Sequence, residues 1–281
     1  MEKLSIIIPV YNELKTLNEI LDQVRAVELR LEKEIILVDD FSTDGTRDIL
    51  KQIEDLSDPL VRVFYHSVNR GKGAALRTGF QNATGDLTII QDADLEYDPQ
   101  DYPKLIQPII ENKADVVYGS RFTDGMQKGL RISYIANRFL TFLSNLLTGL
   151  WISDMETCYK VIKTSILKEI HLTSDRFGIE PEITAKIAKR KCRLVEIPIN
   201  YRGRPFDEGK KISWRDGVAA IFQIIRFRFM DKISPSPLFS YPNSIFASSA
   251  AFTNSLTMVI VKLARFCENA WFACFESDDS R

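Results

Sequence analysis

The sequence predicts an α/β protein built on a doubly wound, mostly parallel sheet, and two observations carry that prediction. Short apolar runs rich in β-branched residues end at Val10, Val38 and Gln91, and segments with helical spacing of apolar residues separate them. The connections between these segments are short, as they are in βαβ units. Ligands of such sheets bind beyond the carboxyl ends of the strands, so we expect the functional site at that edge.

The first half of the chain alternates strands and helices. Apolar residues recur at helical spacing between Leu17 and Val27, and the turn Ser42–Gly45 caps a second helix that continues through Ile53. A third helix, residues 74–82, is entered through a glycine-bounded loop. The strands expected in this half span residues 4–10, 34–38, 61–65 and 87–91. Together these elements predict a parallel half-sheet.

The second half has a different, mixed order. Helices are expected over residues 99–112 (with two interrupting prolines), 133–147 and 180–191. Strands are expected at 115–118 and 193–201, and Pro198 marks the latter as an edge strand. Residues 217–230 are apolar and aromatic with Arg226 and Arg228 interleaved, which leaves two alternatives open. One is a helix packed on the core, and the other is an interfacial helix lying on a membrane.

Bulk properties describe an ordinary globular protein. The chain has 281 residues, 45% of them hydrophobic and 27% charged, enough to bury a substantial core. A net charge of −1 gives no whole-molecule attraction to nucleic acid or to an anionic membrane. The four cysteines lack metal-binding spacing and are too sparse for a disulfide scaffold, which favours reduced thiols in the cytoplasm.

We expect one domain over residues 1–230, followed by a tail, residues 231–281, of uncertain structure. The run Ser234–Pro237 is a linker signal. Residues 245–261 are moderately apolar and barely long enough for a bilayer span, so membrane contact, a poorly ordered tail and a true span all stay open. No signal peptide is expected, because Met1–Lys3 leads directly into a core strand. The sequence does not indicate an oligomeric state.

The most informative motif is Asp92-Ala93-Asp94, at the end of an apolar strand. Two carboxylates at this position suit Mg²⁺ or Mn²⁺, which would hold a diphosphate. Taken alone the motif occurs by chance in surface loops, but three further segments precede it. These are Pro9-Val10-Tyr11-Asn12-Glu13, Val38-Asp39-Asp40 and Asn69-Arg70-Gly71-Lys72-Gly73. Neither a Walker A spacing nor a dinucleotide-binding glycine pattern is present.

These segments, in this order, resemble the family 2 glycosyltransferases with a GT-A-type fold, and most closely the dolichyl-phosphate mannose synthase-like polyprenyl-phosphate sugar synthases. The resemblance implies a nucleotide-binding half of Rossmann type and a mixed acceptor half. It also implies metal-dependent, inverting transfer of mannose or glucose from GDP-mannose or UDP-glucose to dolichyl or undecaprenyl phosphate. Such an enzyme would lie peripherally on the cytosolic face of a membrane.

On the donor side, the resemblance assigns the base and ribose to Pro9, Tyr11, Glu13 and Asp40, with Asp39 orienting the turn. The diphosphate is assigned to Lys72 and Asp92. The metal ligands are expected to be Asp92, Asp94 and Glu96, although Glu96 could equally be a residue that hydrogen-bonds to a ligand or a surface charge.

On the acceptor side, the resemblance assigns the acceptor phosphate to arginines, lysines and a serine. These are Arg121, which with Asp92 and Asp94 forms the expected catalytic set, then Arg131 and Ser133, and Arg204 and Lys211 in a loop. Lys128 is a possible substitute for Arg131 because the local spacing is unusual. Asp154 is expected to order a loop. Glu180 and Glu182 are helix N-terminal charges or contacts to sugar hydroxyls.

Two other functions stay open. A family 2 transferase that acts on a saccharide hydroxyl needs a general-base carboxylate near the acceptor, and none stands out in the second half. A non-catalytic nucleotide-sugar-binding protein would need only the residues that bind the donor. A phosphate acceptor needs no strong base, which agrees with the lack of an obvious catalytic histidine, since His66 and His171 are expected to be structural.

Overall fold

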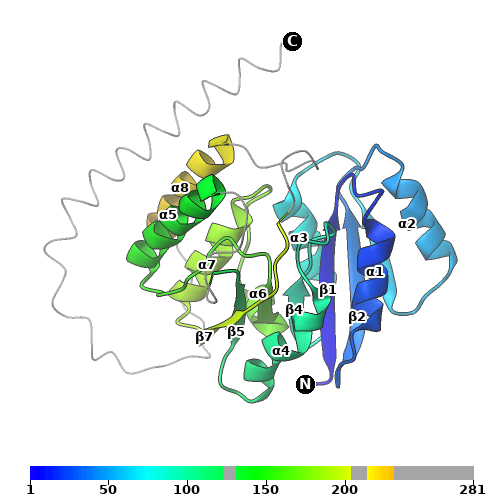
Figure 1. Ribbon diagram of the computed structural model, residues 1–281, viewed down its shortest axis with the longest axis horizontal. Helices are drawn as coiled ribbons and strands as arrows, with labels where there is room; N and C mark the ends of the chain where they lie inside the picture. The colour runs from blue at the N-terminus through cyan, green and yellow to red at the C-terminus, as the bar shows by residue number, and fades with distance from the viewer. Residues whose placement is uncertain (123–130, 204–213, 231–281) are drawn as a thin grey trace, which may run out of the picture.

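The computed structural model describes residues 1–122, 131–203 and 214–230 (Figure 1). The strands are β1 (Lys3–Val10), β2 (Glu32–Asp39), β3 (Val61–Tyr65), β4 (Leu87–Ile90), β5 (Val116–Ser120), β6 (Lys160–Lys163) and β7 (Leu194–Pro198). The helices are α1 (Leu17–Ala26), α2 (Thr46–Asp55), α3 (Lys72–Asn82), α4 (Tyr102–Ile110), α5 (Arg131–Thr148), α6 (Thr164–Glu169), α7 (Ile179–Lys189) and α8 (Trp214–Phe229), with a 3₁₀ turn at Pro99–Asp101. Over these ranges the strands form a seven-stranded sheet in the order β3-β2-β1-β4-β6-β5-β7.

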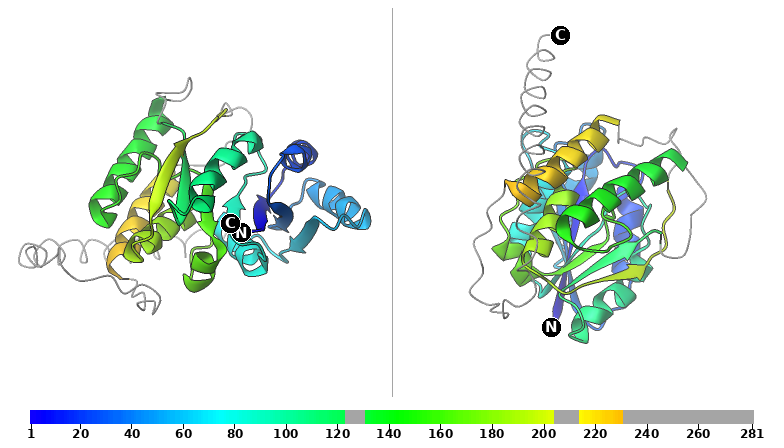
Figure 2. Two further views of the ribbon diagram at one scale, coloured as in Figure 1. Left: turned by 90° about the horizontal axis from the view of Figure 1, so that it is seen from below. Right: turned by 90° about the vertical axis from the view of Figure 1, so that its left-hand side faces the viewer.

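The first half of the sheet is parallel, as predicted. β1 pairs with β2 and with β4, so that Ile6 lies beside Ile35 on one side and Ile89 on the other. These three side chains are fully buried because helices cover both faces of the sheet, and β-branched residues suit such strands (Figure 2). The parallel pairing brings the carboxyl ends of β1, β2 and β4 to one edge, where the polar motifs follow.

The second half is mixed because β6 runs antiparallel between β4 and β5. The sequence prediction did not separate this short strand from the helix that follows it. Antiparallel pairing puts the amino end of β6 at the carboxyl end of β4, since Ile89 lies opposite Val161 and Leu87 opposite Lys163. The segment that precedes β6 therefore reaches the edge where Asp92 lies.

The edge-strand prediction for residues 193–201 is confirmed, because β7 pairs only with β5 among the described strands. Helix α8 lies beside α5 and α7 (Figures 1 and 2). Its Ala220, Ile224 and Phe227 are buried, whereas Arg226 and Arg228 are exposed. The structure therefore favours the core-packing alternative for this helix. The tail, residues 231–281, lies outside the described residues.

Candidate active site

The loops that follow β1 and β2 are joined by hydrogen bonds at the carboxyl edge of the sheet. Asn12 has a positive φ of 54°, a conformation that asparagine tolerates better than most residues. Its amide donates to Ser42 Oγ (2.9 Å), and its side-chain oxygen accepts from the amide of Thr43 (2.8 Å). Tyr11 and Glu13 flank Asn12 and are partly exposed. The two residues expected to contact the nucleotide thus lie at the mouth of the parallel half-sheet.

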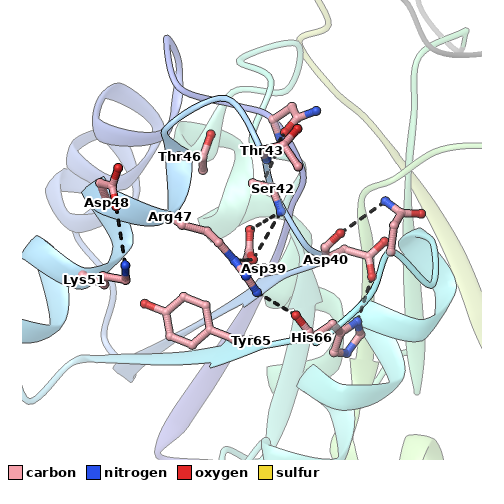
Figure 3. A network of polar contacts seen from close by, with 12 residues as sticks. Asp39, Asp40, Ser42, Thr43, Thr46, Arg47, Asp48, Lys51, Tyr65 and His66 are labelled. Carbon is pink, nitrogen blue, oxygen red and sulfur yellow. Dashed lines mark hydrogen bonds and ion pairs between the residues drawn. The ribbon is translucent and has the colours of Figure 1, made fainter.

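Asp39 is fully buried and orients the turn after β2, as the sequence predicts (Figure 3). Its carboxylate accepts from the amide of Ser42 (3.1 Å) and from Nε of Arg47 (2.6 Å). Arg47 also donates to the carbonyl oxygen of His66, so it ties the turn to the end of β3. Pro9 pairs with Val38 in the neighbouring strand, immediately before these loops.

Asp40 is buried as well, and its carboxylate organises the glycine-rich loop that leads into α3. Oδ1 lies 2.7 Å from Nδ1 of His66 (Figure 3) and accepts from the amide of Arg70 (2.9 Å), and Oδ2 accepts from the amide of Gly71 (2.6 Å). His66 also contacts Thr78 through Nε2, which makes it a structural histidine. A direct contact between Asp40 and the base or ribose stays a prediction.

The glycines of this loop allow it to approach another loop of the second half. Gly71 has a φ of +95°, and a Cβ there would lie 2.6 Å from the carbonyl oxygen of Asp175. A Cβ on Gly73 would lie 2.4 Å from the carbonyl oxygen of Ser174. Glu182 orders that second loop by accepting from the amide of Ser174 (2.7 Å) and from that of the preceding residue. Glu182, in the first turn of α7, therefore holds the loop of residues 173–174 in place.

Lys72, at the start of α3, extends into a group of acids. Its Nζ lies 2.8 Å from Oδ1 of Asp92, 3.0 Å from Oδ2 of the same residue, and 3.3 Å from Oε1 of Glu180. Burial lowers the pKa of Lys72, but its acidic neighbours, with Asp92 foremost, outweigh burial and raise it well above the ordinary value. The charged ammonium group is therefore retained at the point where a diphosphate would enter.

The three expected metal ligands occupy the loop after β4. Asp92 contacts Lys72, and Oδ1 of Asp94 accepts from the amide of Glu96 (3.2 Å). Glu96 accepts instead from the hydroxyl of Tyr201 (2.7 Å). An isolated antiparallel β-bridge joins the next residue, Tyr97, to Tyr201. No cluster of three or more metal-ligating side chains occurs within the described ranges. Hard carboxylate oxygens at Asp92 and Asp94 nevertheless fit a divalent cation that takes its other ligands from a diphosphate and water.

Arg121 follows β5 and forms a bidentate pair with Asp154. Its Nε lies 2.7 Å from Oδ2 and its Nη2 2.8 Å from Oδ1, and both side chains are largely buried. The guanidinium group also lies over the rings of Phe122 and Tyr201, at 5.2 Å from each centroid. Asp154 thus fixes the orientation of Arg121, the residue expected to face the acceptor.

The remaining acceptor residues are only partly placed. Arg131 and Ser133 lie in the first turn of α5, the helix that follows the Arg121 segment in the chain. Lys128, Arg204 and Lys211 lie outside the described residues. Their assignment to the acceptor stays a prediction.

Three charged residues near the site were missed by the sequence prediction or left without a specific role. Glu196 on β7 accepts from the amides of Ser153 (2.7 Å) and Asp154 (3.1 Å), and so positions the partner of Arg121. Lys160, at the start of β6, is fully buried, with Nζ 4.8 Å from the ring centroid of Tyr118. Glu156 precedes it and has a buried carboxylate oxygen without a hydrogen-bond partner. For Glu156 and Lys160 the signal in the sequence is charge interleaved with apolar residues over 154–163, and for Glu196 it is a charge within the expected strand of residues 193–201.

Comparisons with known proteins bear on this site. Among curated relatives, dodecaprenyl-phosphate galacturonate synthase from Rhizobium johnstonii is 25% identical over 264 residues, covering 92% of this chain and 75% of its own. Undecaprenyl-phosphate mannosyltransferase from Micrococcus luteus is 29% identical over 226 residues, covering 76% of this chain and 90% of its own.

Among solved structures, the fold is shared with glucosyl-3-phosphoglycerate synthase from Mycobacterium tuberculosis, crystallised with Mn²⁺, UDP and glucosyl-3-phosphoglycerate. The TM-score is 0.62 at 19% identity, and the match covers 81% of this chain and 80% of that one. The family model of glycosyl transferase family 2 matches residues 5–171, more than half of the chain. The chain therefore belongs to glycosyl transferase family 2 and is a glycosyltransferase with the GT-A-type fold.

Proposed function

We propose that this enzyme transfers a hexose from a nucleoside-diphosphate sugar to a polyprenyl phosphate, with inversion at the anomeric carbon and release of the nucleoside diphosphate. The observation that carries the proposal is a pair of cation–carboxylate contacts at one edge of the sheet, Lys72 with Asp92 and Arg121 with Asp154. The first suits a donor diphosphate and the second an anionic acceptor. The names of the curated relatives, which include polyprenyl-phosphate sugar synthases, support the same reaction. GDP-mannose and UDP-glucose are the donors we propose, and dolichyl or undecaprenyl phosphate the acceptor.

The chemistry assigned to the chain is chiefly electrostatic. The acceptor phosphate is already anionic at neutral pH, so it attacks the anomeric carbon without a strong general base. Arg121 would orient that phosphate, while Lys72 would stabilise the charge that develops on the departing nucleoside diphosphate. A Mg²⁺ or Mn²⁺ ion held by Asp92 and Asp94, with Glu96 as a third candidate, would supply Lewis-acid stabilisation of the same leaving group.

One observation favours a second candidate, transfer to a saccharide hydroxyl. Such a reaction needs a general base, and Glu156 is a carboxyl group of the second half whose pKa is raised to about 8. Burial is the main cause, followed by the charge of Glu180. Replacement of Glu156 by Gln would abolish transfer to a hydroxyl acceptor but not to a phosphate acceptor, so the variant Glu156→Gln separates the two reactions.

We also propose peripheral contact with the membrane that holds the lipid acceptor. The sequence pointed to residues 217–230 or to the tail, but α8 packs on the core, and a row of exposed apolar side chains lies on α5. Ile135, Phe139, Phe142 and Leu146 are 65%, 55%, 58% and 65% exposed and recur at helical spacing. Trp151, just beyond the helix, is 82% exposed.

This α5 stripe suits the interface of a bilayer, where aromatic and apolar side chains insert at the level of the headgroups. None of the described helices meets the length and hydropathy that a bilayer span requires. The double variant Phe139→Ser/Phe142→Ser is expected to release the protein from vesicles of phosphatidylglycerol and phosphatidylethanolamine in a sedimentation assay. Equal sedimentation of the variant and the wild type would contradict contact through α5.

The reaction is tested by offering each radiolabelled donor with polyprenyl phosphate and Mg²⁺ or Mn²⁺, and counting label in the organic phase. Label is expected with one donor and is expected to be lost in Asp94→Asn. The matched control is Asp48→Asn, which removes a carboxylate from the exposed surface pair of Asp48 and Lys51 on α2. Undiminished transfer by Asp94→Asn would contradict the metal site, and no label with either donor would contradict the reaction.

A further inference from the structure

Two buried carboxylate oxygens at the site have no hydrogen-bond partner among the residues that the structure describes. Among the described side chains, Oε1 of Glu156 and Oε2 of Glu180 are both buried and unpaired. Glu180 is only 4% exposed, whereas Glu156 keeps some exposure elsewhere on its side chain. A buried polar atom without a partner costs free energy, so two such atoms on residues that interact electrostatically point to a polar ligand that completes them.

The two residues come from different segments of the chain, and each interacts with a residue assigned to the donor or to the acceptor. Glu180, in the first turn of α7, lies 3.3 Å from Lys72, which in turn contacts Asp92. Glu156 follows Asp154 by two residues and interacts electrostatically with Glu180 and Arg121. The carboxyl pair therefore connects the group that would bind the diphosphate with the group that would bind the acceptor.

The charge state of the pair suits a hydroxyl group. Burial and the neighbouring Glu180 raise the pKa of Glu156 to about 8, although Lys160 and Arg121 act in the opposite direction and Asp154 adds to the rise. At neutral pH Glu156 is then largely protonated and can donate a hydrogen bond, whereas the unpaired carboxyl oxygen of Glu180 can accept one. A sugar hydroxyl both donates and accepts, so it can satisfy both carboxyl groups at once.

We propose that Glu156 and Glu180 bind hydroxyl groups of the transferred hexose and so contribute to the choice of donor sugar. This inference rests on the proposed function, because it takes a nucleotide sugar as the donor. The hexose of such a donor must lie between its diphosphate and the acceptor phosphate, and the interactions of Glu180 with Lys72 and of Glu156 with Arg121 agree with that position. Glu180 also stabilises Lys72, so Glu156 is the cleaner residue to test.

The test compares the affinity for a nucleotide sugar with that for its nucleoside diphosphate, by isothermal titration without any acceptor. UDP-glucose is compared with UDP, and GDP-mannose with GDP. For the preferred donor, Glu156→Ala is expected to weaken binding of the nucleotide sugar about tenfold and leave binding of the nucleoside diphosphate within about twofold. Glu156→Gln, which keeps a donor and an acceptor, is expected to restore most of the difference.

The surface variant Glu111→Gln is the matched control, since Glu111 is exposed and far along the chain from the pair. If Glu156→Ala weakened binding of the nucleotide sugar and of the nucleoside diphosphate equally, the residue would have a structural role and the proposal would be overturned. Unchanged binding of both ligands would also overturn the proposal. A thermal melt of each variant shows whether it is folded. If Glu156→Ala is not folded, Glu156→Asp, which withdraws the carboxyl group by one methylene, takes its place with the same expected and contradicting results. Failure of the lipid-acceptor proposal leaves this comparison unaffected, because no acceptor is present.

Discussion

The Nζ atom of Lys72 lies 2.8 Å from Oδ1 of Asp92, although the two residues lie on different elements and are 20 positions apart. The loop after β2 makes this contact possible, because Asp40 holds the amides of Arg70 and Gly71 just before Lys72. The segments that follow β2, β3 and β4 therefore position the ammonium group of Lys72 together. An arrangement of this kind is suited to a diphosphate that must be bound and then released with more charge than it carried as part of the donor.

The first prediction concerns that cation. Lys72→Met is expected to lower kcat/KM about 100-fold, because the charge on the leaving group loses its partner. It is also expected to weaken binding of the nucleoside diphosphate. Steady-state kinetics and titration calorimetry measure the two effects. Lys51→Met, on the exposed face of α2, is the matched control, and activity of Lys72→Met equal to that of the control would rule out this role.

The second prediction separates two roles for Asp40. If its carboxylate orders the loop of residues 69–73, Asp40→Ala is expected to weaken GDP and UDP alike, and to destabilise the fold by about 2 kcal/mol through the loss of buried hydrogen bonds. If it reads the base, one nucleotide alone would be affected. Calorimetric titration of both nucleotides with this variant distinguishes the roles, and a base-selective loss would contradict the loop-ordering account.

The parallel half of the fold and the donor motifs could be predicted from the sequence because local patterns determine them. Buried parallel strands read as continuous β-branched runs, and polar residues follow each run. The strand β6 could not be predicted in this way. Its four residues, Lys160–Lys163, are too short for a periodicity, and their pairing with β4 and β5 is set by tertiary contacts.

The acceptor half of the site was harder to predict for the same reason. Arg121 could be named from its local motif, but its partner Asp154 and the support from Glu196 depend on the insertion of β6 and on the edge strand β7. Glu156 carries no motif and is identified by its burial and its neighbours. Charge that becomes buried only through long-range packing leaves little trace in a single sequence.

The third prediction concerns the acceptor arginine. Arg121→Lys is expected to lower the rate of transfer about 100-fold, because lysine cannot reproduce the planar bidentate contact with Asp154 or present a guanidinium group to a phosphate. Binding of the nucleotide sugar, measured by titration, is expected to stay within about twofold. A variant that lost donor affinity and transfer in equal measure would place Arg121 on the donor side instead.

The fourth prediction links Glu34 to stability at low pH. This carboxylate, at the amino end of the sheet, accepts from Ser5 Oγ (2.5 Å) and from the amide of Thr84 (2.6 Å). Burial raises the pKa of Glu34, but these hydrogen bonds outweigh burial and bring it to about 2. Because the folded-state pKa is below the unfolded value, the stabilisation is complete above about pH 5 and is lost as the pH falls toward 2.

Urea unfolding measures this effect. Glu34→Gln is expected to lower the free energy of unfolding by about 3 kcal/mol at pH 7, and by less than half of that at pH 3, where the wild type has lost much of the contribution. Glu28→Gln, at an exposed glutamate, is expected to change neither value. A loss that stayed constant between the two pH values would show that the charge of Glu34 is not its source.

The central claim is that the acceptor is a lipid phosphate, and the most direct measurement offers two lipids that differ only in that group. Purified enzyme is given the preferred radiolabelled donor with either polyprenyl phosphate or the corresponding polyprenol, and label in the organic phase is counted. We predict label with the phosphate, no label with the alcohol, and loss of the signal in Arg121→Lys. Label with the polyprenol, or with neither lipid but with a soluble saccharide, would contradict the account.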